Sequence, residues 1–341
     1  DWSSDVCSSD LLIRVYSREG VLDSVSEPVD NLEGALSWRP AGNLMAGVQR
    51  FSDRIDIVFF ERNGLRHGQF SLRLTPEEME TFGKNISLAW NNDSSVLAVI
   101  FEDRVQFWTM GNYHWYLKQE IAAKTTFANS LVWHQEKVLR MIVANADGIN
   151  IIEYIFTVAR SSTMPPHDYG AVAVIDGKNI KLTPLRSANV PPPMAHYELL
   201  IKENTIDVAF NAETSRIVVL HQSGIEVYDW VVSGTTSSVP TVSGRFTFEK
   251  DSESSYLHAS FDEDGNVLVL RRNLLDGTSS ISFHGFDSET GRMVETKPQS
   301  HEAAISLSSF EQDGKDHAFI QGSSGDVHST DAADRSEERR V

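Results

Sequence analysis

The sequence predicts an all-β protein built from β-propeller blades. Short runs of apolar and β-branched residues follow one another and are bounded by Asn, Asp, Ser or Gly, which is typical of strands joined by tight turns. A segment that combines an aromatic residue, a polar turn and an aliphatic strand recurs every 43 to 52 residues, about the length of one blade. Long helical periodicity is missing. The 341 residues, 40% hydrophobic and 23% charged, suit a globular protein with a sizeable core.

The clearest blade lies between Ile86 and Gln119. Four strands in one meander make one blade, and this segment contains four strand-like runs. A single blade leaves both faces of a small sheet exposed, so it requires neighbouring blades. The four runs are Ile86–Trp90, Ser95–Phe101, Arg104–Thr109 and Tyr113–Gln119.

An internal repeat supports this interpretation. Leu36–Ala46 aligns without gaps on Leu88–Ala98, so that Trp38 matches Trp90 at a separation of 52 residues. Unrelated strands of a sandwich are the alternative, but the order of aromatic residue, turn and strand favours blades. Three further copies contain Trp133, Phe210 and Phe261 at the aromatic position.

Other strand-like runs fill the chain on both sides of this blade. Asn63-Gly64 suits the positive φ angles of a tight hairpin, and Pro76 suits the first turn of a short helix over Thr75–Phe82. The predicted runs are Leu12–Tyr16, Val21–Ser26, Ala35–Trp38, Asn43–Gln49, Ile55–Phe60, Gln69–Leu74, Ala171–Ile175, Asn179–Leu185, His196–Ile201, Ala303–Ser309 and Ala318–Gln321.

The two ends of the chain, residues 1–11 and 335–341, resemble translated adapter sequence and are predicted to be artefacts. The remainder, about 12 to 334, is then expected to be an internal fragment. The single cysteine, Cys7, lies in the first end segment, so no cysteine chemistry is expected and a reducing compartment fits.

The chain is acidic, with a formal net charge of −18 at pH 7. Without the five acidic residues and three arginines of the end segments, the 48 acidic and 30 basic residues become 43 and 27, and the net charge becomes −16. Such a surface repels phosphate, so nucleic-acid binding would need a local basic patch. No apolar run approaches the ~20 residues needed to cross a bilayer.

Three segments carry a resemblance to a known family. VQFWTMGNYHWYLKQ (105–119), IVFFERNGLRHGQF (57–70) and VAVIDGKNIKL followed by VPPPMAHYELL (172–200) resemble the Elongator complex protein 1 family, with similarity from about residue 12 to 220. The resemblance implies parts of two tandem WD40-like propellers. The C-terminal part of the first is expected at 12–203 and the N-terminal part of the second at 204–334. One closed ring of about six blades is the alternative.

The resemblance also implies a function. Members of this family are non-catalytic scaffold subunits of the Elongator complex, which modifies the wobble uridine (U34) of transfer RNA. The expected partners are other Elongator subunits, including the catalytic acetyltransferase-like subunit, and the full-length protein is expected to be a homodimer through a region absent here. The expected location is the cytoplasm, with the nucleus as a second location, and no membrane. A WD40-like adaptor of another complex and a propeller enzyme are the alternatives.

Motifs of catalysis, cofactor binding and metal binding are missing from the sequence, so no catalytic, cofactor-binding or metal-binding residue is predicted. The eleven histidines are scattered, and His317 and His328 are the closest pair. The acidic run Asp262–Asn266 is interpreted as a turn between strands. It is not an EF-hand loop, because its Gly265 stands at the fourth instead of the sixth position.

A segment with cations and aromatic residues between 59 and 74 offers side chains of the kinds that bind RNA. A hairpin with its aromatic side chains in the core and its arginines in solvent is the favoured interpretation, and transfer RNA contact is the alternative. The residues are Phe59, Phe60, Arg62, Arg66, His67, Phe70 and Arg73.

The densest aromatic cluster consists of Trp108, Tyr113, His114, Trp115 and Tyr116. Alternation along a strand predicts that the side chains of Tyr113, Trp115 and Leu117 face one way, and those of His114, Tyr116 and Lys118 the other. One set is expected to pack between blades, as are Trp90 and Trp108. The other set, within Tyr113–Tyr116, is a candidate partner surface, because Tyr and Trp are prominent in interfaces.

Overall fold

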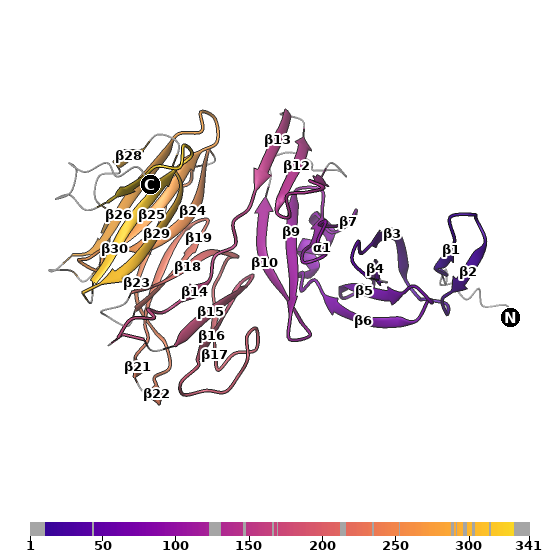
Figure 1. Ribbon diagram of the computed structural model, residues 1–341, viewed down its shortest axis with the longest axis horizontal. Coiled ribbons are helices and arrows are strands. Elements are labelled where there is room, and N and C mark those ends of the chain that lie inside the picture. Colours follow the sequence, from indigo (N-terminus) through magenta and orange to yellow (C-terminus); the bar gives the residue numbers. More distant parts are fainter. Residues whose placement is uncertain are drawn as a thin grey trace. The chain divides into compact units, whose positions relative to one another are not determined.

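The computed structural model describes residues 11–330 except for 43, 123–130, 146–147, 166, 169, 212–215, 234, 252, 288–289, 291, 296–298, 302–303 and 314. The described chain consists mainly of antiparallel strands, which confirms the predicted all-β class. It forms two compact units, residues 1–156 and 157–341 (Figure 1).

The first unit consists of sheets whose strands follow chain order (Figure 1). A two-stranded ribbon precedes two four-stranded sheets and one three-stranded sheet, and the predicted blade at 86–119 is confirmed as the second four-stranded sheet. The strands are β1 (Arg14–Tyr16) and β2 (Leu22–Val25); β3 (Leu32–Trp38), β4 (Leu44–Arg50), β5 (Ile55–Glu61) and β6 (Arg66–Ser71); β7 (Ser87–Trp90), β8 (Leu97–Ile100), β9 (Arg104–Gly111) and β10 (His114–Ala122); and β11 (Leu131–Trp133), β12 (Arg140–Asn145) and β13 (Gly148–Glu153).

In the second unit antiparallel sheets again follow one another along the chain, and the strand-like runs predicted at 171–175, 179–185 and 196–201 are confirmed as strands of its first sheet. Strand β28 pairs with β26 beside β27, and β21 and β22 form a small separate ribbon. The strands are β14 (Ala159–Arg160), β15 (Ala171–Asp176), β16 (Asn179–Pro184) and β17 (Tyr197–Leu200); β18 (Thr205–Asn211), β19 (Arg216–His221), β20 (Gly224–Asp229), β21 (Val232–Ser233), β22 (Thr236–Ser237) and β23 (Thr241–Thr247); β24 (Ser254–Phe261), β25 (Val267–Asn273), β26 (Ser279–Phe286), β27 (Met293–Glu295) and β28 (Gln299–His301); and β29 (Ala304–Gln312), β30 (Lys315–Gly322) and β31 (Val327–Ser329).

The compact units divide between Phe156 and Thr157, whereas the sequence places the change of propeller between residues 203 and 204. Sheet β14–β17 accounts for this difference. Its side chains Ile180 and Leu182 are fully buried in one core with Val208 and Ile217 of the next sheet. Because of this shared core, sheet β14–β17 belongs to the same compact unit as the strands that follow it.

The end segments predicted to be artefacts lie outside the described residues, except for Leu11. The N–H of Leu11 donates to the carbonyl of Val29 at 3.4 Å, and the N–H of Val29 donates back at 3.0 Å. Leu11 therefore continues the backbone pairing of the first unit.

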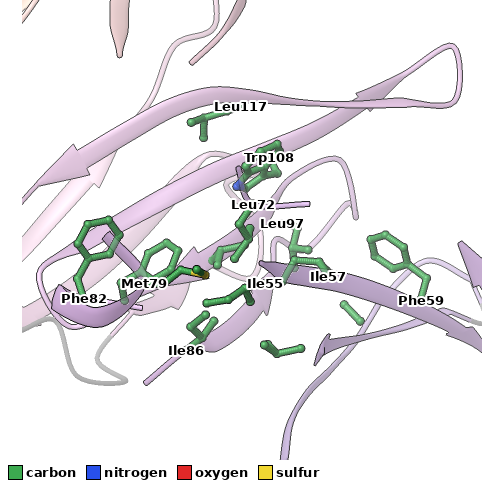
Figure 2. Packing of buried hydrophobic residues seen from close by; sticks show 14 of the residues in the cluster. Ile55, Ile57, Phe59, Leu72, Met79, Phe82, Ile86, Leu97, Trp108 and Leu117 are labelled. Atoms are coloured by element: carbon green, nitrogen blue, oxygen red, sulfur yellow. The ribbon is translucent and has the colours of Figure 1, made fainter. Parts of the chain in front are cut away.

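The cores lie between successive sheets. Strand β8 shows why its sequence, LAVI, is apolar without interruption: Leu97 and Val99 pack towards β3–β6, whereas Ala98 and Ile100 pack towards β11–β13. Figure 2 shows the first of these cores. Burial of one Leu or Ile side chain contributes roughly 1.5–3 kcal/mol. Because such a strand buries side chains on both faces, it stabilises two interfaces at once.

The aromatic residues of the repeat have different surroundings. Trp90 is 7% exposed and Trp108 is 1% exposed, which confirms that both are packing residues. Trp38, which aligns with Trp90, is 44% exposed. The preceding β1–β2 ribbon has only two strands and covers Val58 and Phe60 instead of Trp38.

A polar pair recurs in the third strand of three sheets, between residues two positions apart on one face. The Nε1–H of Trp108 donates to Gln106 at 3.1 Å, and the hydroxyl of Tyr228 donates to Glu226 at 2.8 Å. In β26, Ser282 Oγ and His284 Nε2 are 2.9 Å apart. These pairs satisfy polar groups that would otherwise be buried without partners.

Helix α1 (Pro76–Thr81) confirms the predicted short helix. The hydroxyl of Thr75 accepts the N–H of Glu78 at 3.2 Å, and the Glu78 carboxylate accepts the N–H of Thr75 at 2.8 Å, so both parts of a capping box are present. The buried Met79 anchors the helix in the core shown in Figure 2. None of the helices in the described part of the chain is long and apolar enough to cross a membrane.

The hairpin at Asn63-Gly64 differs from the expectation, because only Gly64 has a positive φ, +86°. The Gly64 N–H donates to the Glu61 carbonyl at 2.9 Å, and Asn63 uses its side-chain oxygen to accept the N–H of Leu65 at 3.0 Å. The paired positive φ angles of a two-residue hairpin turn occur at Asn112 and Tyr113 instead, at 45° and 65°.

Gly64→Ala is expected to destabilise the first unit more than Gly20→Ala. Both glycines have positive φ, +86° and +79°, but a Cβ at position 64 would lie 2.8 Å from the backbone of Val25 and Ser26, whereas position 20 is open. The expected losses are about 3 and about 1 kcal/mol. Urea unfolding followed by tryptophan fluorescence measures both. Equal losses would show that the close approach of β2 has no energetic effect.

His284 is 1% exposed and lies 4.6 Å from the ring of Phe246. Its Nδ1 has no hydrogen-bond partner among the described residues. Burial lowers the pKa of His284 from its ordinary value of 6.5 to about 4. The folded second unit therefore holds this imidazole neutral at pH values where the unfolded chain protonates it.

The lowered pKa of His284 predicts that the second unit loses stability as the pH falls. The contribution of the neutral His284 side chain to the free energy of unfolding is complete above pH 6.5. It declines by ~1.4 kcal/mol per pH unit below that value and is lost near pH 4. Between pH 7 and pH 5 the expected loss is about 2 kcal/mol. Calorimetry of the parent chain and of His284→Phe at both pH values tests this. The same loss in both chains would assign the pH dependence to other groups.

Candidate partner-binding surface

The aromatic residues of the first unit gather between two sheets instead of forming an open ligand cage. Trp115 of β10 stacks on Phe59 at 5.0 Å and on Phe70 at 4.9 Å between ring centroids. Phe70 also contacts Trp108 at 4.6 Å, and Trp90 lies 5.9 Å from Trp115. The rings therefore fill the interface between β3–β6 and β7–β10 and are engaged with one another.

The predicted alternation along β10 is confirmed for Trp115 and Leu117, which pack against this core. It is wrong for Tyr113, which is 94% exposed. Strand β9 ends at Gly111 and β10 begins at His114, so Tyr113 belongs to the turn and not to the strand. Side-chain alternation does not extend through a turn with left-handed φ angles.

The exposed end of this hairpin is the candidate partner surface of the first unit. We call it the β9–β10 tip and define it as Met110, Asn112, Tyr113 and His114. Met110 is 45% exposed, and the side chains at 112–114 are all exposed. A tyrosine at φ +65° is unusual, since left-handed backbone costs a non-glycine residue about 1–2 kcal/mol. The tip thus presents an aromatic side chain to solvent on a strained turn.

The cations of the segment for which transfer RNA contact was the alternative interpretation are held by neighbouring polar groups. Arg62 pairs with Asp23 at 3.1 Å, and His67 lies 3.1 Å from Glu61. Arg66 donates to Gln49 at 2.9 Å and also to Gln69.

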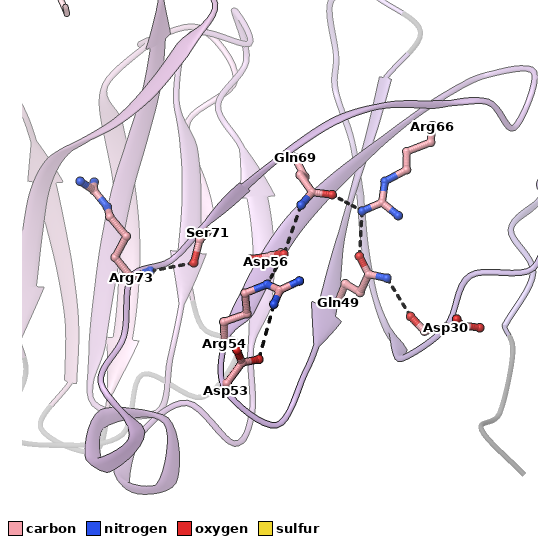
Figure 3. Close-up of polar contacts among 9 residues, drawn as sticks. All are labelled: Asp30, Gln49, Asp53, Arg54, Asp56, Arg66, Gln69, Ser71 and Arg73. Carbon is pink, nitrogen blue, oxygen red and sulfur yellow. Dashed lines mark hydrogen bonds and ion pairs between the residues drawn. The ribbon is translucent and has the colours of Figure 1, made fainter.

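Figure 3 shows that these contacts continue across the sheet. The Gln69 amide donates to Asp56 at 3.3 Å, and Asp56 pairs with Arg54 at 3.1 Å. The guanidinium of Arg73 lies 5.1 Å from the centre of the Trp108 ring. The polar groups on this face are therefore arranged as a chain of alternating donors and acceptors.

The aromatic side chains of the same segment are not free to stack on bases. Phe60 is 1% exposed, and Phe59 and Phe70 stack on Trp115. The concavity of about 290 Å³ beside Arg62 is lined by Asp23, Ser24, Glu61, Arg62 and Asn63, so two acids accompany one cation. The structure does not bring the predicted cations and aromatic rings together on one surface.

The acidic run Asp262–Asn266 is confirmed as a turn between β24 and β25. The carboxylate of Asp262 accepts the N–H groups of Asp264 at 3.0 Å and Asn266 at 2.8 Å. Burial raises the pKa of Asp262, and these hydrogen bonds oppose that rise. The equivalent Asn91 of the second blade uses its side chain in the same way and accepts the N–H of Val96 at 2.9 Å.

A Ser-His-Glu group occurs at the start of β20, where sequence motifs give no signal. Ser223 Oγ lies 3.2 Å from His221 Nδ1 but donates to Glu203 at 2.6 Å. Burial lowers the pKa of His221, and Glu203 and Glu226 oppose that effect. A hydroxyl that donates to a carboxylate in this way is not aligned for activation by the imidazole. Within the described residues no group of three or more His, Cys, Asp or Glu side chains could hold a metal ion.

Successive antiparallel sheets that pack face to face through shared cores define a β-propeller repeat protein. Two family models match this chain: "ELP1 first N-terminal beta-propeller" over residues 4–136 and "ELP1 N-terminal second beta-propeller" over residues 174–340. The chain belongs to the Elongator complex protein 1 family. The second match begins within β15, so it includes most of the sheet that packing groups with the second unit.

Relatives of that name support the assignment. Elongator complex protein 1 of Schizosaccharomyces pombe is 35% identical over 92% of this chain and 24% of its own length. The Saccharomyces cerevisiae protein is 45% identical over 58% of this chain and 14% of its own, and the Mus musculus protein 41% identical over 63% and 17%. The chain thus spans a quarter or less of these relatives. Among solved structures, Saccharomyces cerevisiae Sqt1 aligns over 88% of this chain and 95% of its own, with 10% identity and a TM-score of 0.34.

Proposed function

We propose that this chain is a non-catalytic scaffold segment of an Elongator complex, and that it supports wobble-uridine modification of transfer RNA through protein–protein contacts. The match of both units to the two propeller models of the family carries this proposal. Its partners are the other Elongator subunits, including the acetyltransferase-like catalytic subunit, and the full-length protein forms its homodimer through a region outside this chain. The assembly works in the cytoplasm, with the nucleus as a second location.

The geometry supports a scaffold more than an enzyme. Polar side chains such as Gln106, Glu226 and Asp262 are used in hydrogen bonds that fix strands and turns. The β9–β10 tip offers an exposed aromatic residue, Tyr113. Such a side chain suits insertion into a pocket of a partner protein, where Tyr residues contribute much of the binding energy.

Tyr113→Ala in tagged full-length protein is expected to weaken the association with at least one Elongator subunit by about tenfold or more, because it removes an exposed aromatic anchor. Co-purification at graded salt concentrations and wobble-uridine modification are the measurements. Leu275→Ala is the matched control, since Leu275 is 75% exposed on a turn of the second unit. If Tyr113→Ala and Leu275→Ala retain the same subunits equally well, the tip is not a subunit contact.

Transfer RNA contact at Arg62 and Arg66 is the competing role for the first unit. Because both arginines are held by neighbouring side chains, Arg62→Glu with Arg66→Glu is expected to leave the transfer RNA affinity of the assembled complex unchanged. The slope of log affinity against log salt is also expected to stay the same. A fall in that slope of about one unit or more would instead assign phosphate contacts to these residues.

A further inference from the structure

The hairpin between β5 and β6 contains two neighbouring residues that can react with each other. Asn63-Gly64 is the only Asn-Gly sequence in the 341 residues. In such a pair the backbone nitrogen of the glycine can attack the side-chain amide carbon of the asparagine, because glycine has no Cβ to obstruct the approach. The asparagine loses ammonia and becomes aspartate or isoaspartate. The pair is therefore a candidate site of deamidation.

The folded hairpin holds both reacting groups in place. The N–H of Gly64 donates to the carbonyl of Glu61 at 2.9 Å. The side-chain oxygen of Asn63 accepts the N–H of Leu65 at 3.0 Å, and its amide nitrogen donates to the carboxylate of Glu61 at 3.3 Å. For the reaction, the Gly64 nitrogen must lose its proton and Cγ of Asn63 must turn towards it. These three hydrogen bonds therefore oppose the reaction, although the side chain of Asn63 is exposed.

The same hairpin fastens the β1–β2 ribbon to sheet β3–β6. The carbonyl of Arg62 accepts the hydroxyl of Ser24 at 2.5 Å, and the guanidinium of Arg62 pairs with Asp23 at 3.1 Å. On the other side of the reactive asparagine, a Cβ at Gly64 would lie 2.8 Å from the backbone of Val25. The reactive pair thus lies within the contact between the hairpin and β2.

We propose that Asn63 is a deamidation site, that the folded hairpin delays its conversion, and that conversion loosens the attachment of the β1–β2 ribbon. In the first step the Gly64 nitrogen forms a bond to Cγ of Asn63, the bond from Cγ to Nδ2 breaks, and ammonia leaves. The proton lost by the Gly64 nitrogen reaches the ammonia through solvent. One water molecule then opens the five-membered imide ring. Attack of this water at Cγ gives aspartate, and attack at the backbone carbonyl carbon of residue 63 gives isoaspartate.

Both products disturb the contact with the ribbon. Aspartate replaces the amide that donates to Glu61 by a second carboxylate, so two like charges meet at this position. Isoaspartate adds one methylene group to the backbone beside Gly64, where the approach to Val25 leaves no room even for a Cβ. The apolar core beneath the ribbon, with Val15 and Phe60, is separate from these contacts. The ribbon is therefore expected to loosen at β2 without unfolding of the sheet.

Peptide mapping by mass spectrometry tests the site and the delay. The complete 341-residue chain is incubated at mildly alkaline pH, folded in buffer and unfolded in urea. In urea Asn63 should convert faster than any other asparagine. In buffer it should convert at least about tenfold more slowly than in urea, because its hydrogen bonds must break first. Faster conversion of another asparagine in urea, or equal rates for Asn63 in buffer and urea, would overturn the proposal.

Hydrogen exchange tests the effect on the ribbon. In chains whose Asn63 has converted, the amide hydrogens of β2 should exchange about fivefold faster than in fresh chains, since about one hydrogen bond's worth of attachment is lost. The amides of β8 should exchange at unchanged rates. Asn63→Gln is the matched control, because its longer side chain would have to close a six-membered ring. After the same incubation this variant should exchange as it did before, and circular dichroism checks that it folds. Unchanged exchange of β2 after conversion of Asn63 would show that the ribbon is not loosened and would overturn that part of the proposal.

Discussion

The stacking of Trp115 on Phe59 and Phe70 is the contact on which the first unit depends. Each aromatic pair contributes about 0.5–1.5 kcal/mol beyond the area that it buries, and the rings join two sheets that would otherwise expose their faces. Arg39 lies 5.5 Å from the Trp90 ring, and Arg73 lies over Trp108. The aromatic side chains that could have bound a ligand are therefore used to hold blades together.

Because the faces of the strands are used for packing between sheets, side chains that can contact a partner lie at turns and edges. Interior strands such as β8 contribute to two cores, so the polar side chains beside them must be satisfied within the blade, as Gln106 and Trp108 satisfy each other. The turn at Tyr113, where this stacking ends, is exposed and is the candidate partner surface. This use of the strand faces for packing supports the scaffold role proposed for this member of the Elongator complex protein 1 family.

Much of the fold could be predicted because the relevant signals are local. Four strand-like runs predict the sheet β7–β10, and Pro76 predicts α1, whose capping box involves only Thr75 and Glu78. The face of Tyr113 could not be predicted by alternation, since the strand stops at Gly111 and the turn reverses the chain.

The sequence by itself determined the strand segments, the positions of most turns and, through its motifs, the family. Those features depend on residues that are close together in the sequence, so short segments are enough to predict them. Only the tertiary structure decided that β14–β17 packs with the second unit, and that Trp38 is exposed while Trp90 is buried. Each of these outcomes depends on whether a second sheet covers the first, and burial between two sheets is not a property of either sequence segment alone.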